Sequence, residues 1–103
     1  MIRHLVALRF KAGTADEVKR GLMDDLRRLD RRVDGILDFR ACPNISVEDP
    51  LVRGYRDLFW FDFRDASVRD AYLADETHQR IGARLVAELE GGSDGVLVLD
   101  FEM

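Results

Sequence analysis

The N-terminal stretch MIRHLVALRF, residues 1–10, decides how the sheet of this protein is built. In a β-strand, successive side chains point to opposite faces of the sheet. One face would carry Ile2, His4, Val6, Leu8 and Phe10, and the other would carry Arg3, Leu5, Ala7, Arg9 and Lys11. The first face is the more apolar of the two and should look toward the core. It nevertheless contains His4, an ionisable residue that needs a hydrogen-bonding partner when it is buried.

Hydrophobic spacing and turn residues predict the remaining elements of the chain. In chain order they are a helix over 15–32, a strand over 36–41, a strand within YRDLFWFDF at 55–63, a short helix after Asp65, a helix over 77–90 and a strand over 96–101. The first helix should begin at a capping box formed by Thr14 and Glu17. In the third strand, one face carries Asp57, Phe59, Phe61 and Phe63, and the other carries Leu58, Trp60 and Asp62.

The element order β-α-β-β-α-β, with its second helix broken near 74–76, is typical of ferredoxin-like α+β folds. Because crossover connections are right-handed, the four-stranded antiparallel sheet should have the order 4-1-3-2, with helices on one face. The opposite face would carry Leu5, Ala7, Leu58 and Trp60, together with half of the apolar run at 96–99. A solvated face would be polar there, so the pattern predicts that a second copy of the sheet covers it in a homodimer.

The composition is that of one globular domain spanning residues 1–103. Hydrophobic residues make up 47% of the chain, too many for a disordered protein, and no apolar run is long enough for a membrane span. Arg3, His4 and Arg9 interrupt the only N-terminal apolar stretch, so we expect no signal peptide and a cytoplasmic location. The net charge of −4 argues against a nucleic-acid partner.

The single cysteine, Cys42, has no second cysteine with which to form an internal disulfide. With only two histidines in the chain, the sequence predicts no zinc site, and no residue pattern calls for an organic cofactor. We interpret Cys42 as a small residue near a strand end, with a reactive thiol as the alternative.

Four blocks of the sequence resemble the stress-responsive α/β-barrel domain (Dabb) family, in the family's order: MIRHLVALRFKAGT, PNISVEDPLVRGY, AYLADETHQR and VLVLDFE. The resemblance covers residues 1–102 and implies a ferredoxin-like monomer that forms a dimeric α/β barrel. One plant branch of the family resembles polyketide cyclases that act without a metal or an organic cofactor. That likeness implies a cleft between sheet and helices, lined by His4, Tyr72 and His78.

Two stretches depart from the family pattern. Asp75, Glu76 and Thr77 precede His78 where the family often has His-Pro-Ala, and Asp57 stands where the cyclase branch has a third histidine. Because the first and third strands should be antiparallel, Asp57 is expected at the opposite end of the sheet from His4, too far away to form a dyad with it. The cyclase reaction is therefore an alternative and not the first interpretation.

Periodicity by itself aims His4, Tyr72 and His78 at the layer between sheet and helices, and three interpretations stay open. The polar groups could satisfy one another in a purely structural dimerisation module, or line a cleft that binds a small organic ligand. In the third, a cyclase, isomerase or lyase, His78 would remove a proton next to a carbonyl, Tyr72 would stabilise the enolate and His4 would orient the substrate. A pocket open at Tyr72 and His78 would favour a ligand, whereas closure by Phe59, Phe61 and Leu26 would favour the structural role.

Overall fold

The computed structural model describes all 103 residues. Its strands are β1 (Ile2–Leu8), β2 (Ile36–Pro43), β3 (Asp57–Phe63) and β4 (Val96–Glu102). Its helices are α1 (Asp16–Arg27), α2 (Asp49–Val52), α3 (Ala66–Ala74) and α4 (Glu76–Ala87), with 3₁₀ turns over Arg28–Arg31 and Gly92–Gly95. None of the helices combines the length and the apolar character that a membrane crossing needs. The ferredoxin-like order is confirmed, and α2 is a single helical turn that the sequence patterns did not predict.

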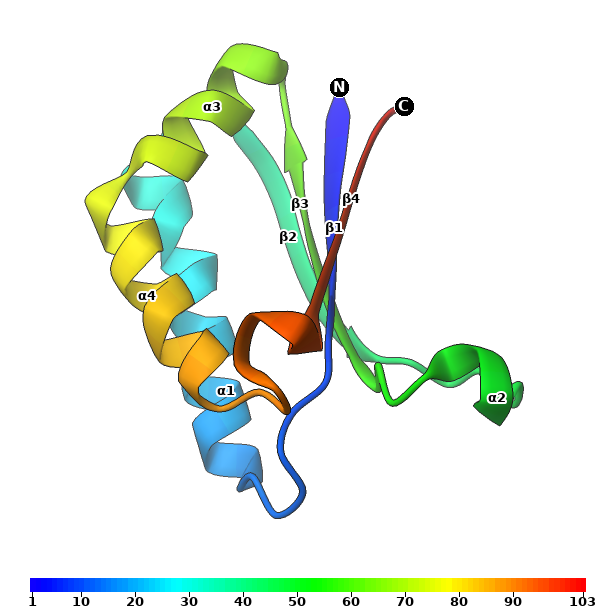
Figure 1. Cartoon of the computed structure of the whole chain (residues 1–103). Helices are drawn as coiled ribbons and strands as arrows, with labels where there is room; N and C mark the ends of the chain where they lie inside the picture. The colour runs from blue at the N-terminus through cyan, green and yellow to red at the C-terminus, as the bar shows by residue number, and fades with distance from the viewer.

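The four strands form one antiparallel sheet in the order β2-β3-β1-β4, which is the predicted order. β1 lies inside the sheet, where Leu8 pairs with Asp57 and Val96 while Ile2 pairs with Glu102. The two ends of the sheet therefore differ. The end at Leu8 carries the connection between β2 and β3, and the end at Ile2 carries both chain termini (Figure 1).

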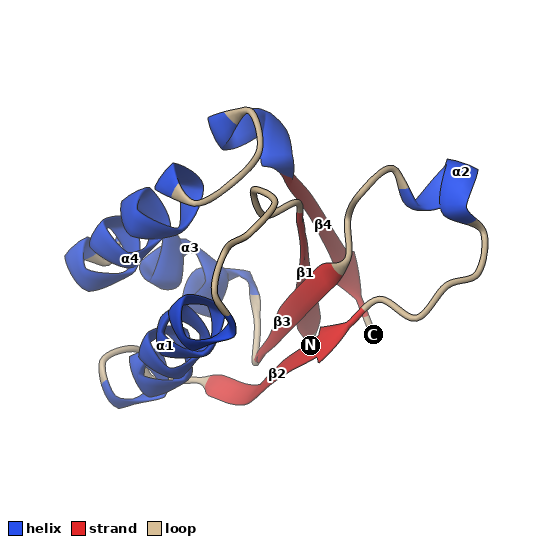
Figure 2. Cartoon of the chain, turned by 90° about the horizontal axis from the view of Figure 1, so that it is seen from below, coloured by secondary structure: helices blue, strands red, loops and turns tan.

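Helices α1, α3 and α4 cover one face of the sheet and leave the other face bare (Figures 1 and 2). The layer between the sheet and these helices is aromatic. Phe59, Phe61 and Phe63 of β3 are buried there, and the Phe61 ring centroid lies 4.7 Å from that of Tyr72 in α3. Aliphatic residues of the helices complete it, among them Leu22, Leu26, Ile81 and Leu85. Each such side chain stabilises the fold by roughly 1.5–3 kcal/mol on burial. The residues predicted to form a site lie in this layer.

The first helix differs from its prediction at both ends. Its N-cap residue is Ala15, and no side chain caps it, so the predicted capping box is wrong. The Thr14 hydroxyl donates instead to the Lys11 carbonyl oxygen at 2.8 Å, which removes it from the helix terminus. At its other end α1 tightens into the 3₁₀ turn over Arg28–Arg31, which keeps Leu29 buried beneath the helix layer.

Asp75 joins α3 to α4 and sets the direction of the second helix. Asp65 caps α3, as predicted, by accepting a hydrogen bond from the Val68 backbone N–H. Asp75 caps α4 in the same way, accepting from the His78 backbone N–H at 2.9 Å, and it also accepts from the Arg32 guanidinium at 3.2 Å. The Arg32 hydrogen bond and the one from His78 lower the pKa of the Asp75 carboxyl. This cap fixes the helical turn that carries His78.

The bare face of the sheet, called the outer face below, has the predicted apolar character. Its residues are Leu5, Ala7, Leu58 and Trp60, joined by Leu97, Leu99 and Phe101 of β4, and all of them are partly exposed or exposed in the single chain. Toward the end with the termini, the Arg3 guanidinium donates to the buried Asp62 carboxylate at 2.8 Å and lies over the Trp60 ring. On β2 the outer face carries Asp38 and Arg40, whose side chains pair at 3.2 Å. The outer face is thus apolar over β1, β4 and most of β3, with ion pairs on β2 and toward the end with the termini.

Replacing Asp75 by alanine should lower the free energy of unfolding by about 1 kcal/mol, because the substitution removes the N-cap acceptor of α4. Urea denaturation at neutral pH measures the effect. Asp24→Ala, an exposed position in the middle of α1, is the matched control and should change stability by less than about 0.5 kcal/mol. Equal losses in the two variants would contradict the capping role of Asp75.

Candidate functional site

The buried His4 has Asp100 as its partner. The register of β1 and β4 places the two residues directly opposite each other. Both side chains lie on the face of the sheet that the helices cover, called the inner face below. His4 Nδ1 lies 2.6 Å from Asp100 Oδ1, a distance typical of a charge-assisted hydrogen bond. Because the His4 residue is only 5% exposed, the carboxylate supplies the contact that a buried imidazole needs. The pair keeps a proton on Nδ1 and leaves Nε2 as the free ring nitrogen.

Asp100 connects His4 to the surface. Its second carboxylate oxygen lies 3.6 Å from the Arg69 guanidinium of α3, and the side chains of both residues are about one-third exposed. Sequence reasoning missed Asp100 as a site residue. The alternation in VLVLDFE shows that Val98 and Asp100 share one face of β4 and that Leu97 and Leu99 share the other. Which of these faces looks inward depends on the strand register. The pairing of Val6 with Val98 and of His4 with Asp100 places Asp100 on the inner face.

Tyr72 lies at the centre of the site and is 1% exposed. Its ring centroid is 5.6 Å from that of His4, in an edge-to-face arrangement, and 5.1 Å from that of Phe63. Burial raises the pKa of the Tyr72 hydroxyl far above its usual range, and no charged group or hydrogen bond contributes to the shift. Tyr72 therefore stays protonated and can only act as a hydrogen-bond donor or a neutral acceptor.

His78 lies against the other side of Tyr72, with the ring centroids 3.9 Å apart. The Asp75 cap holds its backbone, while its ring points from the first turn of α4 into the layer. Burial, and secondly the proximity of His4, lower the pKa of the His78 imidazole, so the neutral form is favoured. Its Nδ1 atom is buried and has no hydrogen-bond partner. The Leu73 backbone carbonyl lies near the ring and partly offsets the lowering of its pKa, but Nδ1 makes no hydrogen bond of standard geometry.

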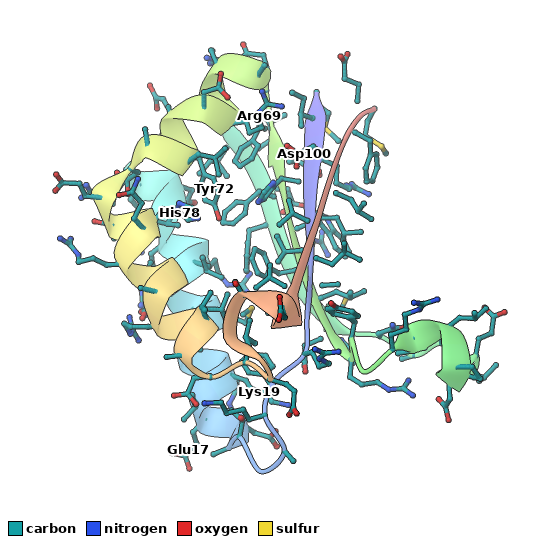
Figure 3. The ribbon with its side chains drawn as sticks, viewed as in Figure 1. Glu17, Lys19, Arg69, Tyr72, His78 and Asp100 are labelled. Carbon is teal, nitrogen blue, oxygen red and sulfur yellow. The ribbon has the colours of Figure 1, made fainter.

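The structure brings all three predicted site residues together. Asp100, His4, Tyr72 and His78 form a row from the edge strand β4, across β1, to α3 and α4 (Figure 3). The structure also separates Asp57 from this row, as predicted: it pairs with Leu8 at the other end of the sheet and binds Lys19 at 3.4 Å. The two histidines do not bond to each other, because Tyr72 stands between them.

The layer beside the row is filled by side chains, although His78 itself is partly exposed at the helices. Phe59, Phe61 and Leu26 are buried next to it, and the five principal hollows of the surface are lined by other residues. The hollow with the largest volume, about 450 Å³, lies between α1 and the ends of β2 and β3, and Cys42 is in its wall. The open side of the row is the β4 edge, where Val98 is half-exposed beside Asp100.

The arrangement can hold and move protons. Neutral His78 offers a ring nitrogen that can accept a proton, Tyr72 offers a hydroxyl hydrogen, and Asp100 can stabilise a positive charge on His4. No cluster of three histidine, cysteine, aspartate or glutamate side chains has a geometry that could hold a metal ion.

Comparison with known proteins assigns the domain. The family model described as the stress-responsive A/B barrel domain matches residues 2–103. No curated protein sequence matches the chain significantly. A dimeric ferredoxin-like protein of unknown function from Jannaschia sp. is 35% identical, with a TM-score of 0.88 and a coverage of 99% of this chain and 98% of that one.

Two further solved structures are more distant in sequence and share the fold. A Dabb family protein from Mesorhizobium loti is 21% identical, with a TM-score of 0.76 over 99% of this chain and 95% of that chain. A hydroxynitrile lyase from Passiflora edulis is 12% identical, with a TM-score of 0.82 over 99% of this chain and 92% of that chain.

The lowered pKa of His78 predicts a specific acid sensitivity. The pKa of His78 is about 6.5 in the unfolded chain and lower in the folded protein. Between these two pKa values the unfolded chain binds more protons than the folded protein. The free energy of unfolding therefore falls as the pH falls through that window. We expect urea denaturation to show a drop from about pH 7.5 to about pH 5.5, and His78→Gln to reduce that drop. His4 is present in both proteins, so the difference isolates His78. A variant with an undiminished drop would contradict the prediction.

Proposed function

The chain belongs to the stress-responsive A/B barrel domain family, and from that premise we propose that it is a homodimer that binds a small carbonyl compound beside Tyr72 and His78. The observation that carries the proposal is the buried, unpartnered Nδ1 of His78 next to a phenol and a carboxylate-bound histidine. A buried polar atom without a partner lowers stability by about 1–3 kcal/mol. The neighbouring Tyr72 hydroxyl also makes no hydrogen bond within the chain, so two adjacent polar groups are free to receive a ligand.

The proposed ligand enters from the β4 edge. There Val98 offers an apolar contact, and the Asp100 and Arg69 side chains are partly exposed. A carbonyl oxygen accepts a hydrogen bond from the protonated Tyr72 hydroxyl, and a C–H or O–H group next to the carbonyl faces the free nitrogen of His78. The apolar walls and the few polar groups of the row match what small organic ligands require.

Proton abstraction is the second candidate function, of the cofactor-free cyclase, isomerase or lyase kind. Neutral His78 takes a proton from the carbon next to the carbonyl, and the C–H electron pair moves to form an enolate whose oxygen is stabilised by Tyr72. The protonated His78 then returns the proton to another atom of the product. His4, held by Asp100, orients the substrate. One protein of this fold is a hydroxynitrile lyase, so the fold is compatible with catalysis.

A purely structural role is the remaining alternative, and the closure of the layer favours it. Tyr72 is almost fully buried, so a ligand has to displace side chains at the β4 edge before it reaches the hydroxyl. In this alternative the row of polar groups only completes the packing between sheet and helices, and the product of the fold is the dimer itself.

A thermal-shift screen with small ketones, β-keto acids and aromatic carbonyl compounds tests the ligand proposal. A ligand at one hundred times its Kd stabilises the folded protein by about 2.7 kcal/mol and raises the wild-type Tm. Tyr72→Phe and His78→Gln should lose most of this rise. Tyr55→Phe is the matched control, because Tyr55 lies at the other end of the sheet and donates to the Asp94 carbonyl oxygen.

The opposite result would support the structural role. In that case no compound raises the wild-type Tm, and the Tm values of Tyr72→Phe and His78→Gln respond to the compounds as little as the wild type does. Proton abstraction is tested separately, by NMR detection of deuterium exchange into any compound that binds. Exchange that is equal in the wild type and His78→Gln would exclude His78 as the base.

The outer face is proposed as the dimer interface. Its apolar residues Leu5, Ala7, Leu58 and Trp60 are accessible in the single chain, and the Trp60 Nε1 atom has no partner within it. Two such sheets would pack about 10 Å apart with their apolar side chains interdigitated. The similar Jannaschia protein, which is dimeric, supports this arrangement.

Trp60→Asp should convert the dimer into a monomer or unfold the protein, because the substitution places an unpaired charge in the interface. Analytical ultracentrifugation at micromolar concentration measures the mass, which for the wild type should be twice the 11.8 kDa of one chain. Leu73→Asp, exposed on the helical layer, is the control and should stay dimeric. A monomeric wild type would exclude the interface.

A further inference from the structure

The connection between β2 and β3 forms an arm, residues 44–56, that projects from the body of the protein at α2 (Figures 1 and 2). Its aliphatic side chains are the most exposed large hydrophobic groups of the chain: Val47 is 92% exposed, Ile45 86% and Leu51 65%. Aliphatic groups so fully exposed on one segment indicate a surface that has a partner.

The arm has a defined internal structure. The Asn44 side chain donates to the Tyr55 carbonyl oxygen at 2.9 Å and accepts from the Ser46 backbone N–H at 3.0 Å. Arg56 donates to the Ser46 carbonyl oxygen and pairs with the Asp49 carboxylate. These bonds hold the apolar side chains in place although no residue of the same chain covers them.

The extended arm leaves this chain with more surface than its mass requires. The accessible surface is 6356 Å², whereas a folded monomer of this mass exposes about 5,900 Å². The projecting arm and the bare outer face both contribute to this accessible surface, and both are available for burial against another molecule.

The arm continues the outer face. Leu51, Val52 and Tyr55 line a hollow of about 380 Å³ together with Ala7, Leu58 and Leu97 of the sheet. The arm therefore stands on the side where the second copy is proposed to pack. A helical turn is about 10 Å wide, whereas the midplane between two packed sheets is only about 5 Å from each, so the arm crosses that midplane.

This crossing restricts the symmetry of the dimer. Two identical faces that pack on each other are related by a twofold axis lying in the midplane. If the axis ran along the strands, both arms would stand at the same end of the sheets. Each arm reaches from its root at β2 and β3 across to Ala7 of β1 and Leu97 of β4, so the two arms would collide over the middle of the sheets. If the axis runs across the strands, the arms stand at opposite ends, and each one passes beyond the end of the partner's sheet.

We propose that the arm is a clasp for a second copy of this chain, an inference that rests on the proposed dimer. Each arm lies against the terminal end of the partner's sheet, where the apolar residues Met1, Phe101 and Met103 are exposed. Ile45 and Val47 contact these residues across the interface. The clasp covers exposed apolar side chains on both the arm and the terminal end of the sheet.

Cysteine cross-linking tests the geometry, in a Cys42→Ser background. The double variant Val47→Cys/Met103→Cys should form a disulfide-linked dimer on mild oxidation, detected on a non-reducing gel. Within one chain Val47 belongs to the arm at the Leu8 end of the sheet, whereas Met103 follows β4 at the Ile2 end. The length of a seven-residue strand, about 23 Å, lies between the two ends, so no link can form within one chain. Each single-cysteine variant is a control. A dimer linked through Val47→Cys alone would place the arms side by side and overturn the proposal.

Ile45→Ser/Val47→Ser tests the contribution to affinity. It should raise the dimer dissociation constant at least about tenfold, because apolar contacts across the interface are lost, while the free energy of unfolding of the monomer stays the same. Val18→Ser/Leu73→Ser, which changes two exposed aliphatic residues on the helical layer, should leave the dissociation constant unchanged. A dimer with unchanged affinity would overturn the clasp alone, whereas a monomeric wild type would overturn the dimer as well.

Discussion

The structure depends on one constraint: its sheet is apolar on both faces, but the chain supplies helices for only one of them. Strand β1 shows this most clearly, since His4, Val6 and Leu8 are buried beneath the helices while Leu5 and Ala7 face the bare side. Helices α1, α3 and α4 satisfy the inner face. The outer face can be satisfied only by another molecule, and an identical sheet offers a surface of matching shape and character.

The inner layer combines close aromatic packing with a row of polar groups that reaches the surface. Phe61 packs against Phe63 and Tyr72, which makes the layer rigid around the Tyr72 ring. A buried imidazole would destabilise such a layer if it were isolated. Asp100 removes that penalty because it lies on the edge strand, where its carboxylate keeps contact with water and with Arg69. The polar row is therefore possible at this edge and not in the middle of the sheet.

The Asp75 cap couples the fold to the site. It ends α3, starts α4 and binds Arg32 of the preceding helical segment, so that Tyr72 and His78 come from two short helices that meet at a fixed angle. A continuous helix would place residues six positions apart on different faces, because the helical period is 3.6 residues. The break near Asp75 is what lets both rings point at the sheet and lie against each other, with centroids 3.9 Å apart and planes tilted by 36°.

The sequence by itself determined the β-α-β-β-α-β order, the strand order and the inward faces of β1 and β3, because periods of 2 and 3.6 residues are local properties of the chain. It also identified His4, Tyr72 and His78 as inward-facing polar residues. It could not supply the partner of His4, since strand register is a long-range property and a shift of one residue exchanges the two faces of β4. The start of α1 was mistaken for a related reason: the Thr14 hydroxyl is bound by a carbonyl of the turn before it. Only the tertiary structure decided that Asp100 stands opposite His4, that Tyr72 separates the two histidines, and that the arm lies on the side of the uncovered face.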